Sequence, residues 1–362
     1  MLIRNLSGKP DNIVLREQKT IERCEEIESA LPSYLRPYFM YLGTAVLPNT
    51  RFAYLNEILN FFEYLIDSGY TAGRTKEPKE ILEKDLFSMT ADEINLYLNY
   101  LRRYKKVLNG KETVITNDNK ALARKKAAIK SLYKFLFHDG KTHYDITGGI
   151  NPVRVPKKTD SEIKVLEDSE VKRMLDIVST GEGLTKTQIR YWNKTKYRDK
   201  AMLLLFVTYG LRLSELAELN VSSFNFMRNE FTIYRKGAKE RAMPLNEKVG
   251  ASISIYLAEE RPDMEGSPER DALFVSLQKK RLTEKAIRET VKKYTALALG
   301  TGIGYSPHKL RATTATSLIG RGASIYDVQE LLDHGDVSTT QIYARHQKGV
   351  VKSLVERLED WE

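Results

Sequence analysis

A stretch near the middle of the chain, residues 151–160 (NPVRVPKKTD), limits how the sequence can fold more than any other feature. Its two prolines exclude a regular helix, and the polar residues that follow show no apolar periodicity. A chain of 362 residues is also too long for one ordinary domain and suits two. We therefore predict that a linker between Val155 and Asp160 joins two domains, residues 1–155 and 156–362.

The pattern of the first domain predicts helices only. Residues 53–66 carry apolar side chains at helical spacing, and Gly69 lies just beyond them as a stop signal. Thr90 and Glu93 form a capping-box signature that opens a second helix. A third helix is predicted over residues 119–138. We expect an all-helical N-terminal domain.

The second domain combines helices with a small sheet. The apolar run 201–209 predicts a buried helix that stops at Gly210. Residues 231–234 and 242–245 flank a glycine-bearing turn, which predicts a β-hairpin. The sequence after Thr283 is again helical in pattern. The predicted fold class is mainly α, with an α+β second domain that contains a small antiparallel sheet.

The chain is basic, with a formal net charge of +10 at pH 7, and this charge favours a polyanionic partner such as nucleic acid. Basic residues crowd the third predicted helix, where lysines recur four residues apart. Like charges at that spacing weaken a helix unless something neutralises them, and a DNA backbone would do so. A basic face that merely contacts solvent is an equally compatible alternative. The candidate DNA-binding residues on this helix are Arg124, Lys125, Lys126, Lys130 and Lys134.

Several classes of protein are disfavoured. No apolar run approaches the roughly 18 residues that would cross a bilayer, so we expect no membrane insertion. The first residues lack the apolar core of a secretory signal, and the single cysteine, Cys24, cannot form an internal disulfide. The five histidines and this cysteine show no ligand spacing, so we expect no metal and no other cofactor. These features predict a cytoplasmic protein.

Two short blocks place arginine and histidine where they could bind an anion. Arg212 lies between the buried helix and the next helix, although it could merely pair with Glu215 three residues on. His308 and Arg311 follow a Ser-Pro pair that favours the start of a helix. Their spacing puts both side chains on one face near a helix N-terminus, where anions are favoured. A lone histidine of this kind is more often structural than catalytic.

A third block contains His334 and Tyr343. Ser338 and Gln341 form another capping box, so Tyr343 is predicted in the second turn of a short helix. Residue type alone singles out none of the 20 tyrosines, because a tyrosine in a short helix usually belongs to a core or its rim.

Together the blocks resemble the tyrosine recombinase (phage integrase) family. The strings GLRLSEL, YRKGAKERAMPL, SPHKLRATTATSLIGRG and LLDHGDVSTTQIYARH match that family block for block and in order. The likeness covers the second domain, while the first matches only in its helical, basic character and its position. The catalytic positions that the resemblance implies are Arg212, Lys236, His308, Arg311, His334 and the nucleophile, Tyr343.

The resemblance also implies a domain organisation. Residues 1–155 would be a helical, SAM-like core-binding domain, and residues 156–362 would be the catalytic domain of the tyrosine recombinase fold. A tail helix is expected over about residues 349–362, where apolar side chains follow one helical stripe. This helix could pack on its own domain, whereas the resemblance implies that it docks in a neighbouring protomer.

Elementary chemistry agrees with these roles. A phosphodiester under attack gains negative charge on its non-bridging oxygens, which Arg212 and Arg311 could clamp, with His334 as a further donor. A tyrosine with a pKa near 10 is only about 0.1% ionised at neutral pH, so Tyr343 needs a base. His308 is the candidate for that base.

A lysine on the hairpin could give the departing 5′ oxygen its proton. The family pattern places this acid at Lys236, before the glycine, while Lys239 and Arg241 are its rivals and further candidate DNA-binding residues. We expect Glu215 to hold the Arg212 side chain in position without itself contacting the substrate.

Within the family the chain most resembles the Xer group, and there the single-protein XerS-type recombinases of Gram-positive bacteria. The stretches FFEYLIDSG, SLYKFL and KYRDKA carry this likeness. It implies chromosome dimer resolution through a 3′-phosphotyrosyl intermediate and a Holliday junction. The implied partners are double-stranded DNA at a specific recombination site, a homotetramer on paired sites with exchanged C-terminal tails, and a cell-division or accessory regulator.

Three alternatives remain. The first is the integrase or transposase of a mobile element. The second, from another class, is a non-catalytic DNA-binding protein on the same fold, against which the intact set of six residues argues. The third is a nicking-closing topoisomerase, which would relax supercoils on DNA that lacks a specific site.

Overall fold

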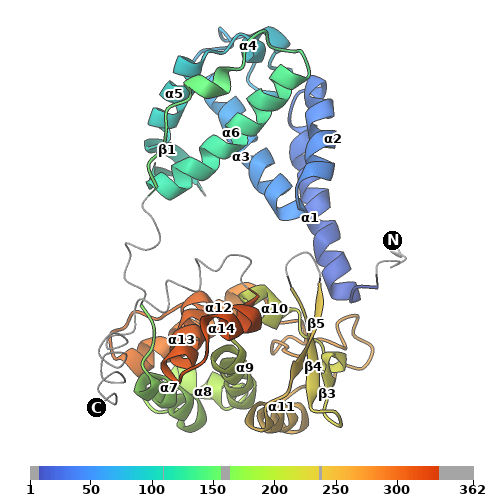
Figure 1. Ribbon diagram of the computed structural model, residues 1–362, viewed down its shortest axis with the longest axis vertical. Helices are drawn as coiled ribbons and strands as arrows, with labels where there is room; N and C mark the ends of the chain where they lie inside the picture. The colour runs from blue at the N-terminus through green and yellow to red at the C-terminus, as the bar shows by residue number, and fades with distance from the viewer. Residues whose placement is uncertain (1–7, 109, 156–163, 236–238, 334–362) are drawn as a thin grey trace, which may run out of the picture. The chain divides into compact units, whose positions relative to one another are not determined.

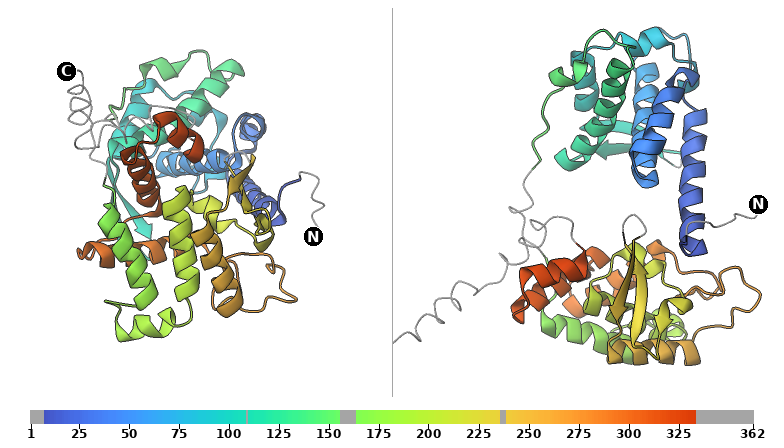
Figure 2. Two further views of the ribbon diagram at one scale, coloured as in Figure 1. Left: turned by 60° about the horizontal axis from the view of Figure 1, so that its bottom comes forward. Right: turned by 45° about the vertical axis from the view of Figure 1, so that its right-hand side comes forward.

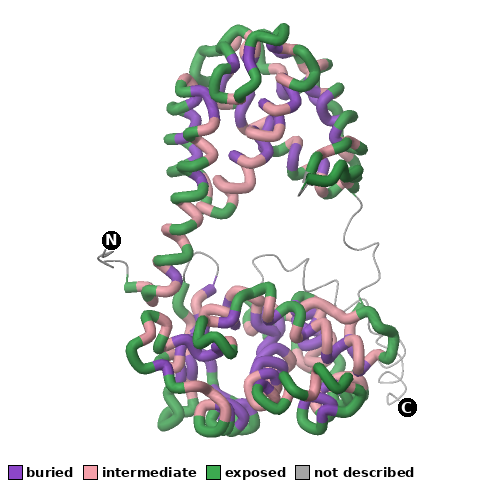
Figure 3. The backbone as a smooth tube through the Cα atoms, turned by 180° about the vertical axis from the view of Figure 1, so that it is seen from behind, coloured by how far each residue is buried: buried purple, intermediate pink, exposed green. Residues whose placement is uncertain are grey.

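The computed structural model of the chain describes residues 8–108, 110–155, 164–235 and 239–333. These residues form two separately packed units, Met1–Lys157 and Lys158–Glu362 (Figure 1). In each unit the buried residues gather where helices face one another (Figure 3). None of the helices in this part of the chain is both long and apolar enough to span a membrane.

The first unit is built from helices around a core rich in aromatic side chains. Phe61, Phe62, Tyr97 and Tyr133 are all almost completely buried in it. The predicted capping box is present, because Thr90 accepts from the Glu93 backbone and Glu93 from the Thr90 backbone. The helices are α1 (Asp11–Ser29), α2 (Arg36–Ala45), α3 (Pro48–Asp67), α4 (Glu83–Phe87), α5 (Ala91–Tyr100) and α6 (Asn119–His138).

A β-hairpin between α5 and α6 departs from the all-helical pattern that the sequence analysis predicted for this unit. Strands β1 (Arg103–Leu108) and β2 (Lys111–Thr116) pair antiparallel along their whole length. Tyr104 packs against Tyr100, with ring centroids 5.2 Å apart, and the Lys106 ammonium lies 3.0 Å from a Glu63 carboxylate oxygen on α3. The Asn-Gly dipeptide between the strands is a strong hairpin signal that the helical reading of this domain overlooked.

The second unit surrounds the buried helix α9 (Lys196–Tyr209), which ends at Gly210 as predicted. Helices α7, α11 and α13 pack against α9, and Figure 2 (left) shows it between α7 and α11. The other helices are α7 (Asp168–Thr180), α8 (Lys186–Trp192), α10 (Leu213–Ala217), α11 (Glu247–Glu259), α12 (Glu284–Leu299), α13 (Pro307–Gly320) and α14 (Ile325–Leu332).

The sheet of this unit has three antiparallel strands in the order β3-β4-β5. Strands β4 (Glu230–Tyr234) and β5 (Glu240–Pro244) form the predicted hairpin, and β3 (Phe224–Asn225) adds a short third strand that was not predicted. The described elements after Thr283 are helical, as expected. The predicted fold class, mainly α with a small antiparallel sheet, is confirmed.

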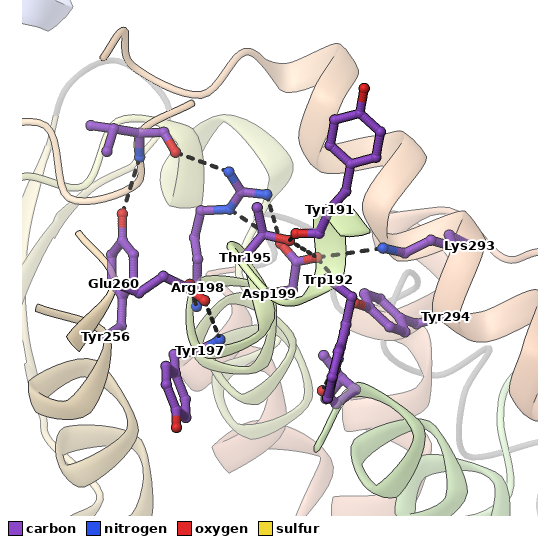
Figure 4. Close-up of polar contacts among 12 residues, drawn as sticks. Tyr191, Trp192, Thr195, Tyr197, Arg198, Asp199, Tyr256, Glu260, Lys293 and Tyr294 are labelled. Atoms are coloured by element: carbon purple, nitrogen blue, oxygen red, sulfur yellow. Dashed lines mark hydrogen bonds and ion pairs between the residues drawn. The ribbon is translucent and has the colours of Figure 1, made fainter. Parts of the chain in front are cut away.

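Asp199 anchors the start of α9 in a cluster of polar side chains (Figure 4). Its side chain is 1% exposed and forms an ion pair with Arg198 at 2.8 Å. The Tyr294 hydroxyl donates to Asp199 at 3.1 Å, and the Lys293 ammonium lies 3.5 Å from the same carboxylate. Burial lowers the pKa of Lys293, and the Asp199 carboxylate opposes that shift. One carboxylate therefore compensates two cations at the edge of the core.

Glu260 holds the same end of α9 from a second direction. Its carboxylate accepts from the backbone N–H groups of Tyr197 and Arg198, at 3.2 and 2.7 Å. Those groups have no partner within the helix, and a negative charge is favourable at a helix N-terminus. The start of α9 is thus fixed on two sides, and its far end leads to Gly210 and Arg212.

We predict that Asp199→Ala lowers the free energy of unfolding by about 3 kcal/mol, the lower end for a broken buried pair, because it leaves the half-buried Arg198 and Lys293 without their counter-charge. Urea denaturation would measure this loss. The matched control is Asp168→Ala, which removes a carboxylate that pairs with Arg321 at 2.9 Å on the surface. That loss should stay below about 1 kcal/mol. Equal losses in the two variants would contradict the anchoring role of Asp199.

Candidate active site

The turn after α9 brings the first candidate residue into place. Gly210 has φ +58°, a left-handed conformation that favours glycine. A Cβ at this position would lie only 2.6 Å from Cδ2 of Leu332 on α14. Glycine is therefore required twice, once by the backbone and once by the close approach of α14. The chain then enters α10, with Arg212 at the N-cap position.

Glu215 supports Arg212 by two contacts. Its Oε1 lies 2.6 Å from the Arg212 guanidinium, and its Oε2 accepts from the Arg212 backbone N–H at 2.8 Å. The Glu215 side chain is 2% exposed, whereas that of Arg212 is 31% exposed. The i, i+3 ion pair is therefore present, and it leaves part of the guanidinium open to solvent.

The second candidate arginine comes from α13. Ser306 occupies the N-cap position and Pro307 the first turn, as expected, although the Ser306 side chain makes no capping hydrogen bond. Arg311 is 3% exposed and donates to the Gly210 carbonyl at 2.7 Å and to the Leu332 carbonyl. His308 lies one turn earlier on the same helix and is exposed.

Arginine side chains from three parts of the unit donate hydrogen bonds to the carbonyl groups at the end of α14. Arg212 donates to the Asp333 carbonyl at 2.7 Å, next to the Leu332 carbonyl that Arg311 contacts. From the hairpin, Arg235 donates to the Leu331 and Leu332 carbonyls at 2.7 and 3.1 Å, and Arg241 donates to the Glu330 carbonyl at 2.7 Å. We call this set, Arg212, Arg235, Arg241 and Arg311 with the carbonyls of residues 330–333, the arginine–carbonyl cluster.

The cluster agrees with elementary electrostatics. The last carbonyls of a helix lack partners within it and carry partial negative charge, which arginine side chains can satisfy. The cap residue, Asp333, has φ +52° and directs its carbonyl to Arg212. Two candidate catalytic residues, Arg212 and Arg311, are thereby brought together around one helix end, directly before His334.

Arg235 is a member of this cluster that the sequence analysis missed. It is 4% exposed, and its guanidinium lies 3.5 Å from the Glu215 Oε1 that also pairs with Arg212. The alternation of the strand could have indicated it, because Phe231, Ile233 and Arg235 share the buried face. Residue type gave no such signal among the many cations of the hairpin.

The remaining candidates of the hairpin and the tail are placed only in part. Lys239 is exposed, and Arg241 also pairs with the Glu330 carboxylate at 3.2 Å. Lys236, His334 and Tyr343 lie outside the described residues, so their catalytic roles stay predictions. Within the described ranges, no group of three or more His, Cys, Asp or Glu side chains is arranged to hold a metal ion.

The basic residues of α6 fall into different classes. Lys125 is buried and its ammonium lies 2.5 Å from Glu57, so we leave it out of the candidate DNA-binding set. Lys126 donates to the carbonyls of Ile150 and Asn151, at 3.2 and 2.5 Å. Burial lowers the pKa of Lys126, and the charge of Lys130 adds to that shift, as expected for like charges four residues apart.

Three further candidates on α6, Arg124, Lys130 and Lys134, reach solvent. The Arg124 side chain is 66% exposed and lies 3.8 Å from Glu57. Lys134 is exposed and Lys130 is half-buried. These three remain candidates for contact with a polyanion.

Comparison with known proteins identifies the family of this chain. Residues 164–349 match the family model described as the phage integrase family. The tyrosine recombinase XerD of Oceanobacillus iheyensis is 30% identical over 320 residues, which cover 88% of this chain and 94% of the relative. The tyrosine recombinase XerC of Caldanaerobacter subterraneus subsp. tengcongensis is 32% identical over 330 residues, which cover 90% and 86%.

Solved structures share the fold. The XerH recombinase bound to its palindromic difH substrate, in a post-cleavage complex, has a TM-score of 0.62 at 19% identity and covers 94% of this chain and 89% of that one. A lambda integrase tetramer bound to a Holliday junction has a TM-score of 0.55 at 15% identity, over 86% and 76%. On the family match and the relatives in sequence, the chain belongs to the phage integrase family, the tyrosine recombinases, and is similar to its Xer members.

Proposed function

We propose that this chain is a site-specific recombinase that cuts and rejoins DNA through a covalent bond to Tyr343. The observation that best supports this function is the arginine–carbonyl cluster. It brings Arg212 and Arg311 together from α10 and α13, at the helix end that His334 follows directly. Two guanidiniums at one place suit the non-bridging oxygens of a phosphodiester.

In the proposed reaction, the Tyr343 oxygen attacks the scissile phosphorus and forms a 3′-phosphotyrosyl bond, while the bond from phosphorus to the 5′ oxygen breaks. His308 takes the tyrosine proton, and Lys236 gives a proton to the departing 5′ oxygen. Arg212 and Arg311, with His334, stabilise the charge that develops on the phosphate. Attack by a 5′ hydroxyl of the partner strand then rejoins the DNA and releases Tyr343, which yields a Holliday junction after the first exchange.

The biological role that we propose is chromosome dimer resolution of the Xer type. The similarity to XerD and XerC over most of the chain supports it, and the single-protein XerS-type form is the finer part of this proposal. The DNA-bound solved relatives support double-stranded DNA with a specific site as the partner, and the lambda integrase tetramer supports a tetramer. Exchanged tails over residues 349–362, an accessory regulator and a cytoplasmic location belong to the same proposal. The integrase or transposase of a mobile element is the second candidate.

Tyr343→Phe should bind the recombination site as the unchanged protein does but form no covalent adduct, because it removes only the phenol oxygen. A nicked suicide substrate resolved on a denaturing gel measures the adduct. The control is Tyr326→Phe, which alters an exposed tyrosine of α14 outside the proposed machinery and should leave the adduct unchanged. An adduct that persists in Tyr343→Phe would assign the nucleophile to another residue.

We also propose that α6 contacts the DNA backbone through Arg124, Lys130 and Lys134. Phosphate contacts of this kind release counterions, so each contact steepens the dependence of affinity on salt. Arg124 and Lys134 are exposed and Lys130 is half-buried, on a helix whose other face packs into the core of its unit, and this placement supports the proposal.

Lys130→Ala combined with Lys134→Ala should weaken binding and reduce the slope of log affinity against log salt by about one to two units. The matched control is Lys76→Ala with Lys84→Ala, which removes two exposed lysines elsewhere in the same unit. Fluorescence anisotropy across a salt series measures both slopes. If the two double variants change the slope equally, the face of α6 makes no specific phosphate contact.

A further inference from the structure

Arg235 is a buried charge to which the proposed reaction gives no part. It directly follows β4, and its backbone N–H donates to the Lys239 carbonyl at 2.8 Å. This hydrogen bond joins the residue before Lys236 to a residue that follows it in the chain. Removing a guanidinium from water is unfavourable unless acceptors compensate it. Its Nε finds no acceptor among the described residues, so the two Nη groups provide the compensation seen there.

Those Nη groups contact two other parts of the site. Nη1 lies 3.5 Å from Glu215 Oε1, and the same oxygen lies 2.6 Å from Arg212. Nη1 and Nη2 also donate to the carbonyls of Leu332 and Leu331, at 3.1 and 2.7 Å. Burial lowers the pKa of Arg235, and the Glu215 carboxylate opposes that shift. One guanidinium therefore joins the hairpin, the support of Arg212 and the end of α14.

We propose that Arg235 is a positioning residue that sets the strand before Lys236 against Glu215 and the end of α14. This inference rests on the proposed function. Lys236 is the next residue along the chain, and His334 is two residues beyond Leu332. The chain thus enters the general acid, Lys236, directly from Arg235. It enters the segment that leads to the nucleophile just after the carbonyls of α14 that Arg235 contacts. A planar fork reaches three acceptors at once, which a lysine ammonium at this position would not do.

The test compares cleavage of two nicked suicide substrates, one with an ordinary bridging 5′ oxygen and one with sulfur, a leaving group that needs no proton. Lys236→Ala should be slower by about 10²- to 10⁴-fold on the oxygen substrate and near wild type on the sulfur substrate. Arg235→Lys should show the same pattern with a smaller loss, up to about 10²-fold, because it misplaces the acid without removing it. Its affinity for the site should stay unchanged.

Arg281→Lys is the control for loss of an arginine outside the cluster, because Arg281 is half-buried and its guanidinium also donates to carbonyl oxygens. Arg281 donates to the carbonyls of Ala217 and Leu219 and to the Asn220 side chain, and burial lowers its pKa as well. It has no contact with the arginine–carbonyl cluster in the described part of the chain. Any loss that comes from general destabilisation should therefore be equal on the two substrates.

The outcomes separate this inference from the proposed function. If sulfur rescues Lys236→Ala but not Arg235→Lys, Arg235 has no positioning role and the proposed function stands. If sulfur rescues neither variant, the acid role of Lys236 falls, and hydrogen–deuterium exchange decides on Arg235. Faster exchange in β5 and α14 for Arg235→Lys, but not for Arg281→Lys, supports the inference, and unchanged exchange overturns it.

Discussion

The end of α14 is the point on which the geometry of the second unit depends. Guanidiniums that would repel one another in isolation share a row of carbonyl oxygens, and the Glu215 carboxylate lies between two of them, Arg212 and Arg235. The arrangement uses the unpaired acceptors that every helix end presents, so it needs few additional acidic residues. Removal of those acceptors would leave buried positive charge without compensation, which is why the cluster fixes α10, α13 and the hairpin together.

Helix α9 connects this cluster to the core. At its start, Asp199 compensates two half-buried cations, and Glu260 accepts from the first backbone N–H groups of the helix. At its end, Gly210 turns the chain and offers its carbonyl to Arg311. A rigid helix held at both ends places Arg212 with the accuracy that a phosphate clamp requires, and loops alone would not provide it.

Local signals in the sequence predicted most of the elements, but not how charged side chains are distributed between core and surface. The span of α6 and the capping box at Thr90 follow from periodicity and cap chemistry, which act within a few residues. By contrast, Lys125 and Lys126 are neighbours of the same type, and only the position of Glu57 on α3 places the first in the core. The strand alternation could have indicated that Arg235 is buried, but not its acceptors, which come from residues far along the chain. The catalytic assignments at Lys236, His334 and Tyr343 rest on the family pattern and remain predictions.

The contact between Gly210 and Leu332 has a consequence for how this protein can change during evolution. Glycine is already the smallest residue, so position 210 cannot shrink to accommodate a larger side chain on α14. Growth at position 332 must instead be absorbed by a shift of the helix end, and that shift would move the carbonyls that orient the four arginines of the cluster. Side chains larger than leucine should therefore be disfavoured at position 332. Substitutions in this part of the core should instead accumulate at neighbouring positions.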